Sequence, residues 1–142
     1  MKKECKCLQN GFLEQLYKIQ EDTQKNVYNI DSDDLTIGEL IDLIIKNDVA
    51  ERDEMFEILE AIGGKYKKAS WKFWKKDYPE VSKMKLSDLL SSKEKDELMM
   101  EIVDKFMFIT NMLVYLGISP QELIPYMKEK DKINRNRQKN GY

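Results

Sequence analysis

The spacing of apolar residues along the chain predicts an all-α protein, a bundle of about five helices. Apolar residues recur every three or four positions, and no segment alternates apolar and polar residues long enough to indicate a strand. The predicted helices cover roughly residues 10–27, a segment opened by Thr36, and roughly residues 49–62 and 91–116, with a last helix from Ser119. The residues expected to face inward are Phe12, Leu16, Ile19, Leu40, Ile41, Ile44, Ile45, Ile102, Val103, Phe106, Ile109, Leu113 and Leu116.

Local signals mark where several of these helices begin and end. Thr36-Ile-Gly-Glu39 and Ser119-Pro-Gln-Glu122 have the spacing of a capping box, which opens a helix. Gly63-Gly64 should interrupt the third helix, because glycine favours turns. Residues 81–92 contain only a short apolar cluster, so we expect a loop there with one brief helix.

Length and composition favour a single domain over residues 1–142. Charged residues make up 35% of the chain and the net charge is −2, which argues against general affinity for nucleic acid. No apolar run approaches the roughly 20 residues that span a bilayer. The amino terminus has a basic start but lacks the apolar core of a signal peptide. We therefore expect a cytoplasmic protein with neither a membrane nor a nucleic-acid partner.

The absence of histidine restricts the chemistry open to the chain. It excludes Ser-His and Cys-His triads, zinc or haem held by histidine, and imidazole bases. Cys5 and Cys7 are the only cysteines, too few for an ordinary four-ligand zinc site, so a reduced pair near the chain end is the simpler interpretation. An enzyme made from this chain has to use carboxylates, amines, guanidinium groups and amides.

The third predicted helix carries a stripe of glutamates. Glu51, Glu54, Glu57 and Glu60 recur every three residues, so they share one helix face and repel by roughly a few tenths of a kcal/mol per adjacent pair. A solvated face, balanced by water and nearby lysines, is the ordinary explanation of such a stripe. A metal-binding pair is the alternative, and Glu51/Glu54, Glu54/Glu57 and Glu57/Glu60 all have the same spacing.

The fourth predicted helix favours the metal-binding explanation. Glu101 and Asp104 also lie three residues apart, but in an apolar segment, where acids are seldom buried unless paired or bound to metal. If the two helices pack antiparallel, one pair from each can converge. Converging carboxylates raise one another's pKa unless a cation neutralises them. An all-oxygen ligand set suits Mg²⁺ better than zinc.

Three segments of the sequence resemble the all-α nucleoside triphosphate pyrophosphatases, a superfamily that includes MazG-like enzymes and dimeric dUTPases. After the ExxE stripe, residues 101–111 resemble that family's E-x-x-D-x-x-H-F-x-x-N helix. Residues 71–76 resemble the W-K-x-W-K segment of dimeric dUTPase-like proteins. Residues 130–142 are the most specific piece and resemble the ending K-N-x-x-N-x-x-R-Q-x-x-G-Y. The resemblance covers roughly residues 35–142 and points to the dUTPase-like branch of bacteria and phages.

This resemblance implies roles for individual residues. The implied ligands of Mg²⁺ are Glu54, Glu57, Glu101 and Asp104. Glu54 is also expected to orient or deprotonate the attacking water. The implied substrate contacts are Asn111 for the base or deoxyribose, Lys130, Asn134 and Arg137 for the phosphates, and Trp71 or Trp74 for a wall of the base pocket.

Simpler interpretations stay open for several of these residues. The tryptophans can be core anchors, or can stack on nucleic acid together with the neighbouring lysines. Asn111 can be a buried amide whose hydrogen bonds are satisfied inside the protein. The carboxyl terminus can be a disordered charged tail, although the spacing of Lys130 and Arg137 puts both on one face of a helix.

Two positions depart from the family pattern. Met107 stands where the family usually has histidine, and Asp131 where it usually has asparagine. Because this histidine is missing, the resemblance leaves open which nucleotide base the enzyme recognises.

The first hypothesis for the function is a homodimeric enzyme that converts dUTP to dUMP and pyrophosphate. The second is the same reaction on another nucleotide such as dCTP, dATP or a modified triphosphate, and the third is a catalytically silent helical regulator. A homodimer is expected because so few helices leave apolar faces incompletely covered.

Overall fold

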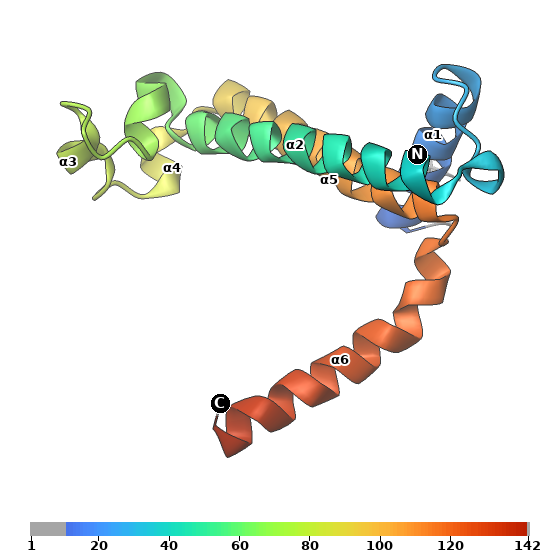
Figure 1. Ribbon diagram of the computed structural model, residues 1–142. Helices are drawn as coiled ribbons and strands as arrows, with labels where there is room; N and C mark the ends of the chain where they lie inside the picture. Colours follow the sequence, from blue (N-terminus) through green and yellow to red (C-terminus); the bar gives the residue numbers. More distant parts are fainter. Residues whose placement is uncertain (1–10, 142) are drawn as a thin grey trace, which may run out of the picture. The chain divides into compact units, whose positions relative to one another are not determined.

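The computed structural model describes residues 11–141, which form helices joined by turns (Figure 1). The long helices are α1 (Phe12–Asn26), α2 (Ile37–Ile62), α5 (Ser92–Leu116) and α6 (Pro120–Asn140). The short ones are the 3-10 helices η2 (Ser32–Asp34) and η3 (Gly64–Ser70), with α3 (Tyr78–Val81) and α4 (Leu86–Leu89). No strand occurs among residues 11–141, so the all-α prediction is confirmed. Cys5 and Cys7 lie outside the described residues.

The chain divides into two compact units. We call Ile41–Ile109 the central unit; the terminal unit comprises Met1–Leu40 and Thr110–Tyr142. The prediction of a single domain over residues 1–142 stays a prediction.

The central unit is built on α2 and α5, which lie side by side (Figure 1). They run antiparallel, because Asn47 of α2 contacts Phe108 of α5 while Glu51, one turn later, contacts Lys105, one turn earlier. The predicted break in α2 before Val49 was wrong. Asn47 is buried, and its side-chain amide donates to the Phe108 carbonyl at 2.6 Å. The polar residue at the expected boundary is therefore part of the packing between two helices.

Capping boxes open three of the long helices. Thr36 N–H donates to Glu39 Oε2 at 2.9 Å, and Glu39 N–H donates to Thr36 Oγ1 at 3.3 Å. Ser119 donates to Glu122 Oε2 from its N–H at 2.7 Å and from its hydroxyl at 2.8 Å. The same pattern precedes α5 at Ser91. Each box satisfies backbone donors that a helix start leaves without partners.

The terminal unit contains α1, the last turns of α5, and α6, which contacts α1. Leu16 and Leu113, both predicted to face inward, are buried there, whereas Phe12 and Ile19 are more than half exposed. Three amides are buried beside these apolar residues, and we call them the amide cluster: Gln20, Gln24 and Asn111. The core of this unit is therefore partly polar.

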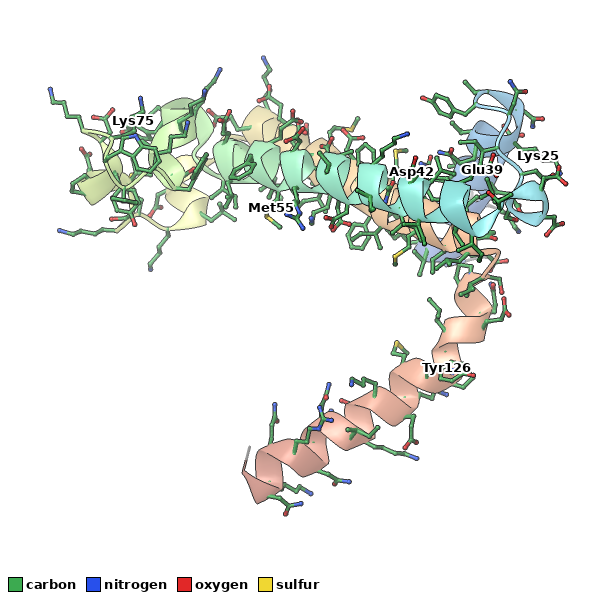
Figure 2. All side chains as sticks on the ribbon, in the orientation of Figure 1. Lys25, Glu39, Asp42, Met55, Lys75 and Tyr126 are labelled. Carbon is green, nitrogen blue, oxygen red and sulfur yellow. The ribbon has the colours of Figure 1, made fainter. Side chains whose placement is uncertain are left out.

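An apolar surface runs along α2 and α5 in the central unit. Ile41, Ile45 and Val49 recur every four residues and are 51%, 57% and 58% exposed. Met55, labelled in Figure 2, and Phe106 of α5 are about two-fifths exposed. The prediction that Ile41 and Ile45 face inward was therefore wrong for this chain. Side chains at four-residue spacing form a ridge, the kind of surface that packs against another helix.

Among the described helices, none is by itself long and apolar enough to cross a bilayer. Only α5 and α6 taken together, as a bent pair, meet the requirements of length and composition.

Candidate metal centre

The antiparallel pairing of α2 and α5 brings three acids of the central unit together. Glu54 comes from α2, and Glu101 and Asp104 come from α5. Each offers a carboxylate oxygen, and these oxygens all lie within 4.8 Å of one another. All three residues are half-buried. We call them the carboxylate cluster, and their oxygens are close enough to bind one cation together.

Glu57 lies at the edge of this cluster. Its side chain is exposed, and it follows Glu54 by three residues in α2. Its carboxyl is close enough to hydrogen-bond with Glu101, and this contact helps to raise the pKa of Glu101. Of the four predicted metal ligands, three form the cluster and Glu57 stands beside it.

Burial and like charges both disfavour the ionised state of the cluster. Burial is the largest cause of the raised pKa of Glu54, followed by the negative charges of Glu57, Asp104 and Asp53. Burial also contributes most to the raised pKa of Glu101. In addition, Glu54 Oε2 is buried and has no hydrogen-bond partner among residues 11–141. Such an oxygen is costly to bury unless something outside the chain binds it. These oxygen donors fit a divalent cation.

The other glutamates of the stripe have lysine partners. Lys105 Nζ lies 3.0 Å from Glu51 Oε1, and Lys68 Nζ lies 3.8 Å from Glu60 Oε1. Lysines therefore balance the two ends of the stripe, as in a solvated face. The middle of the stripe, at Glu54, faces the acids of α5 instead.

The two tryptophans occupy different environments in the central unit. Trp71 is half-buried and stacks against Phe56 of α2, with 5.1 Å between ring centroids. Its Nε1 is buried without a hydrogen-bond partner in the described part of the chain. Trp74 is 61% exposed and meets Trp71 edge-on, with centroids 6.3 Å apart. Trp71 therefore anchors the segment after α2, and a substrate contact by either tryptophan stays a prediction.

Asn111 belongs to the amide cluster of the terminal unit. Its Oδ1 accepts hydrogen bonds from Gln20 Nε2 at 2.8 Å and from Gln24 Nε2 at 3.2 Å. Tyr115 extends the cluster, because its hydroxyl donates to Gln24 Oε1 at 3.3 Å. These bonds agree with the interpretation of Asn111 as a satisfied buried amide. Its contact with a base or deoxyribose stays a prediction.

The three predicted phosphate contacts lie in the second half of α6, where every residue is exposed: Lys130, Asn134 and Arg137. The segment is helical, so their spacing does place them along one helix face. Asp131, the departure from the family pattern, forms an ion pair with Arg135 at 2.8 Å. Figure 2 shows the side chains of this helix, with Tyr126 labelled in its first half.

A pocket of about 390 Å³ adjoins the carboxylate cluster in the central unit. Its lining residues are Glu57, Glu60, Ala61, Gly64, Lys67, Glu94, Glu97 and Glu101. The sequence reasoning missed Glu94, Glu97 and Lys67. The sequence does contain a pattern that indicates the two glutamates. Acids recur at helical spacing along one face of α5, at Glu94, Glu97, Glu101 and Asp104.

Comparison with known proteins shows similarity to three phage proteins, two of them named dCTP pyrophosphatase. No family model and no solved structure matches the chain. The chain is 34% identical over 112 residues to a dCTP pyrophosphatase of Enterobacteria phage LZ5, covering 75% of this chain and 64% of that protein. It is 33% identical over 112 residues to a dCTP pyrophosphatase of Enterobacteria phage T4, covering 75% and 65%. A DNA replication protein of Enterobacteria phage T4 is 31% identical over 106 residues, 70% of this chain but 27% of that protein. The chain thus spans just under two thirds of the length of the dCTP pyrophosphatases it matches.

Proposed function

We propose that this protein is a metal-dependent nucleoside triphosphate pyrophosphohydrolase, with dCTP as its leading substrate and dUTP as the alternative. The observation that carries the proposal is the carboxylate cluster, in which a buried oxygen of Glu54 has no partner in the described part of the chain. Two relatives named dCTP pyrophosphatase support the reaction and favour dCTP. The carboxyl-terminal motif favours dUTP through the resemblance described above.

The proposed metal ligands are Glu54, Glu101 and Asp104, with Glu57 beside them. Mg²⁺ is the proposed ion, because it prefers oxygen ligands and commonly bridges protein carboxylates and substrate phosphates. When bound, it would neutralise charge on the phosphate oxygens and polarise the attacking water.

The proposed reaction requires one proton acceptor from the chain. The oxygen of water forms a bond to the α-phosphorus, and the bond from that phosphorus to the α,β-bridging oxygen breaks. Pyrophosphate leaves with the electron pair of the broken bond, while Glu54 accepts a proton from the water. Glu54 is proposed as the acceptor because it belongs to the carboxylate cluster and its Oε2 has no hydrogen-bond partner in the described part of the chain.

The remaining predicted contacts are part of the same proposal. Lys130 and Arg137 would bind phosphate by charge-assisted hydrogen bonds, with Asn134 between them on the same helix face. Asn111 would contact the base or sugar. An exposed aromatic ring such as Trp74 can stack on a base.

We further propose that a second copy of this chain covers the apolar surface of α2 and α5. Ile41, Ile45 and Val49 are each more than half exposed, and a monomer rarely leaves such a ridge in water. Light scattering after gel filtration should give twice the chain mass. Ile45→Glu should shift the protein to the monomer, whereas Lys46→Glu, at an exposed polar position, should not.

Incubation with a panel of nucleotides tests the activity. Purified protein receives dCTP, dUTP, dATP, dGTP, dTTP or CTP with Mg²⁺, and pyrophosphate and monophosphate are measured. Preferential cleavage of dCTP supports the proposal, and preferential cleavage of dUTP supports the alternative. Cleavage of another nucleotide would keep the reaction and overturn the base assignment. No turnover, together with no effect of Mg²⁺ on Tm, would overturn the enzyme proposal.

A further inference from the structure

Lys67 has a backbone conformation that lysine rarely adopts. Its φ is 44° and its ψ is −112°, within η3. A positive φ brings the Cβ of an L-residue against its own backbone, so glycine would be the more stable residue here. Residues held in this way concentrate at binding and catalytic sites, where the position of the side chain matters.

The double glycine before Lys67 makes this conformation accessible. A Cβ on Gly63 would lie 2.2 Å from the backbone oxygen of Lys67. A Cβ on Gly64, whose φ is +53°, would lie 2.6 Å from the backbone oxygen of Leu89. Backbone atoms cannot swing aside as a flexible side chain can. Both glycines are therefore needed for the turn that presents Lys67 just after α2.

The turn places Lys67 in the wall of the pocket beside the carboxylate cluster. Glu101 of the carboxylate cluster and Glu57 beside it both line this pocket. Lys67 is the single cation among the residues that line it. No ion pair or hydrogen bond joins the Lys67 side chain to any residue in the described range. Its ammonium group is therefore available to a ligand.

Three other glutamates that line the pocket, Glu60, Glu94 and Glu97, have their own partners. Glu60 pairs with Lys68 at 3.8 Å, and Glu97 pairs with Lys93 at 3.9 Å. Glu94 accepts the backbone N–H of Ser91 at 2.8 Å as part of the capping box of α5. None of these acids needs Lys67, so a role as their counter-ion does not explain why a lysine is held there.

We propose that Lys67 binds the β- and γ-phosphates of the substrate, the part that leaves as pyrophosphate. This inference rests on the proposed function, which puts the α-phosphate at the carboxylate cluster. From Asp104 toward the carboxyl end of α5 lie the half-buried Met107 and Phe108. Toward the amino end lie the residues of α5 that line the pocket. A charged polyphosphate is excluded from the apolar side by the cost of desolvation. Five glutamates also line the pocket, so the phosphates would enter it as their Mg²⁺ complex, with Lys67 as the one cation that the lining residues supply. An ammonium is an ordinary ligand for phosphate.

Lys67→Gly separates binding from folding. The substitution removes the ammonium and supplies the residue that best tolerates a positive φ. We expect a Tm equal to or above that of the unchanged protein, and a KM for the cleaved nucleotide raised about tenfold or more, because a charge-assisted hydrogen bond is lost. Lys67→Arg keeps the charge and should retain most of the affinity. Lys76→Gln is the control: Lys76 is exposed in the same lysine-rich segment and does not line the pocket, so KM should not change.

Binding of inorganic pyrophosphate with Mg²⁺, measured by calorimetry, tests the lysine without turnover. Lys67→Gly should bind pyrophosphate about tenfold more weakly and bind the nucleoside monophosphate unchanged. If the unchanged protein cleaves no nucleotide, the proposed function fails, but the two pyrophosphate affinities still test the lysine. If it cleaves nucleotide and Lys67→Gly has the same KM and the same pyrophosphate affinity, Lys67 has been assigned wrongly while the proposed function stands. A lower Tm for Lys67→Gly would show a structural role and overturn the inference.

Discussion

The amide cluster of the terminal unit and the carboxylate cluster of the central unit resolve the burial of polar groups in opposite ways. Asn111, Gln20 and Gln24 are each 7% exposed or less, and their amides hydrogen-bond to one another. An amide has both donors and an acceptor, so a group of amides can satisfy itself. An ionised carboxylate is an acceptor only, so the acids at Glu54 and Glu101 cannot satisfy each other.

This difference separates a polar cluster that is satisfied within the chain from one that is not. Raised pKa values at Glu54 and Glu101 express a destabilising arrangement, which costs free energy in the absence of a cation. Acids with raised pKa values that face one another are found more often at functional sites. We therefore expect substitutions in the amide cluster to change stability, and substitutions in the carboxylate cluster to change ligand binding and turnover.

The largest expected effect is at Asp104. Asp104→Asn keeps the shape of the side chain but removes one negative charge from the proposed metal site. Loss of a ligand charge costs several kcal/mol of transition-state stabilisation, so turnover should fall about a thousandfold or more. Pyrophosphate release gives the rate, and circular dichroism checks that the helices remain. Full activity in this variant would show that the metal ligands have been assigned wrongly.

The next effect is at Asn111, and it should appear in stability. Asn111→Ala leaves two buried amide donors, Gln20 Nε2 and Gln24 Nε2, without their acceptor. The expected loss is about 2 kcal/mol of unfolding free energy, measured by urea denaturation. Gln138→Ala, exposed on α6, is the control and should stay within about 0.5 kcal/mol of the unchanged protein. An Asn111→Ala protein of unchanged stability would remove the contrast between the two clusters.

A smaller effect of opposite sign is expected at Glu54. Glu54→Gln relieves repulsion among like charges, so without metal the unfolding free energy should rise by roughly 0.5 kcal/mol. The same substitution should abolish the rise in Tm that we expect Mg²⁺ to cause in the unchanged protein. A stability that falls in the absence of metal would argue that the cluster is not strained.

Glu51 provides the matched control for Glu54, because it lies three residues earlier on the same stripe. Its carboxylate pairs with Lys105 at 3.0 Å, and both side chains are less than a third exposed. Glu51→Gln should therefore lower stability, while the effect of Mg²⁺ on Tm remains. The two glutamates are alike in sequence spacing, and only their partners on α5 distinguish them.

Sequence predicted the features that depend on near neighbours. The capping boxes at Thr36 and Ser119 need only residues three positions apart, and both form. The i, i+3 acids on two helices were also visible in the sequence, although their roles stay proposals. The break expected before Val49 was wrong, because Asn47 at that position bonds to the Phe108 carbonyl, 61 positions away, and near neighbours give no sign of this contact.

Periodicity shows that a helix has an apolar face but not what covers it. For this reason Ile45 was expected to face inward and is exposed. Lys67 was beyond the reach of pattern reasoning for another reason. Its place beside the pocket depends on an unusual backbone conformation after Gly63 and on the start of α5, and neither leaves a signal at residue 67 itself.

The smallest expected effect concerns Glu39. Unlike Glu54 of the carboxylate cluster, whose Oε2 has no partner in the described residues, Glu39 accepts hydrogen bonds from nearby donors. The backbone N–H and the hydroxyl of Thr36 both donate to it, and they lower its pKa below the ordinary value of 4.5. A lowered pKa in the folded state means that ionised Glu39 stabilises the fold fully above pH 4.5 and loses this contribution as the pH falls through the folded pKa.

The substitution Glu39→Gln keeps a capping side chain that does not titrate. The unchanged protein should therefore melt slightly higher than the variant at pH 7, and the difference in Tm should disappear as the pH is lowered through the folded pKa. Other acids titrate equally in both proteins, so a difference that does not depend on pH would show that the charge of Glu39 has no part in the cap.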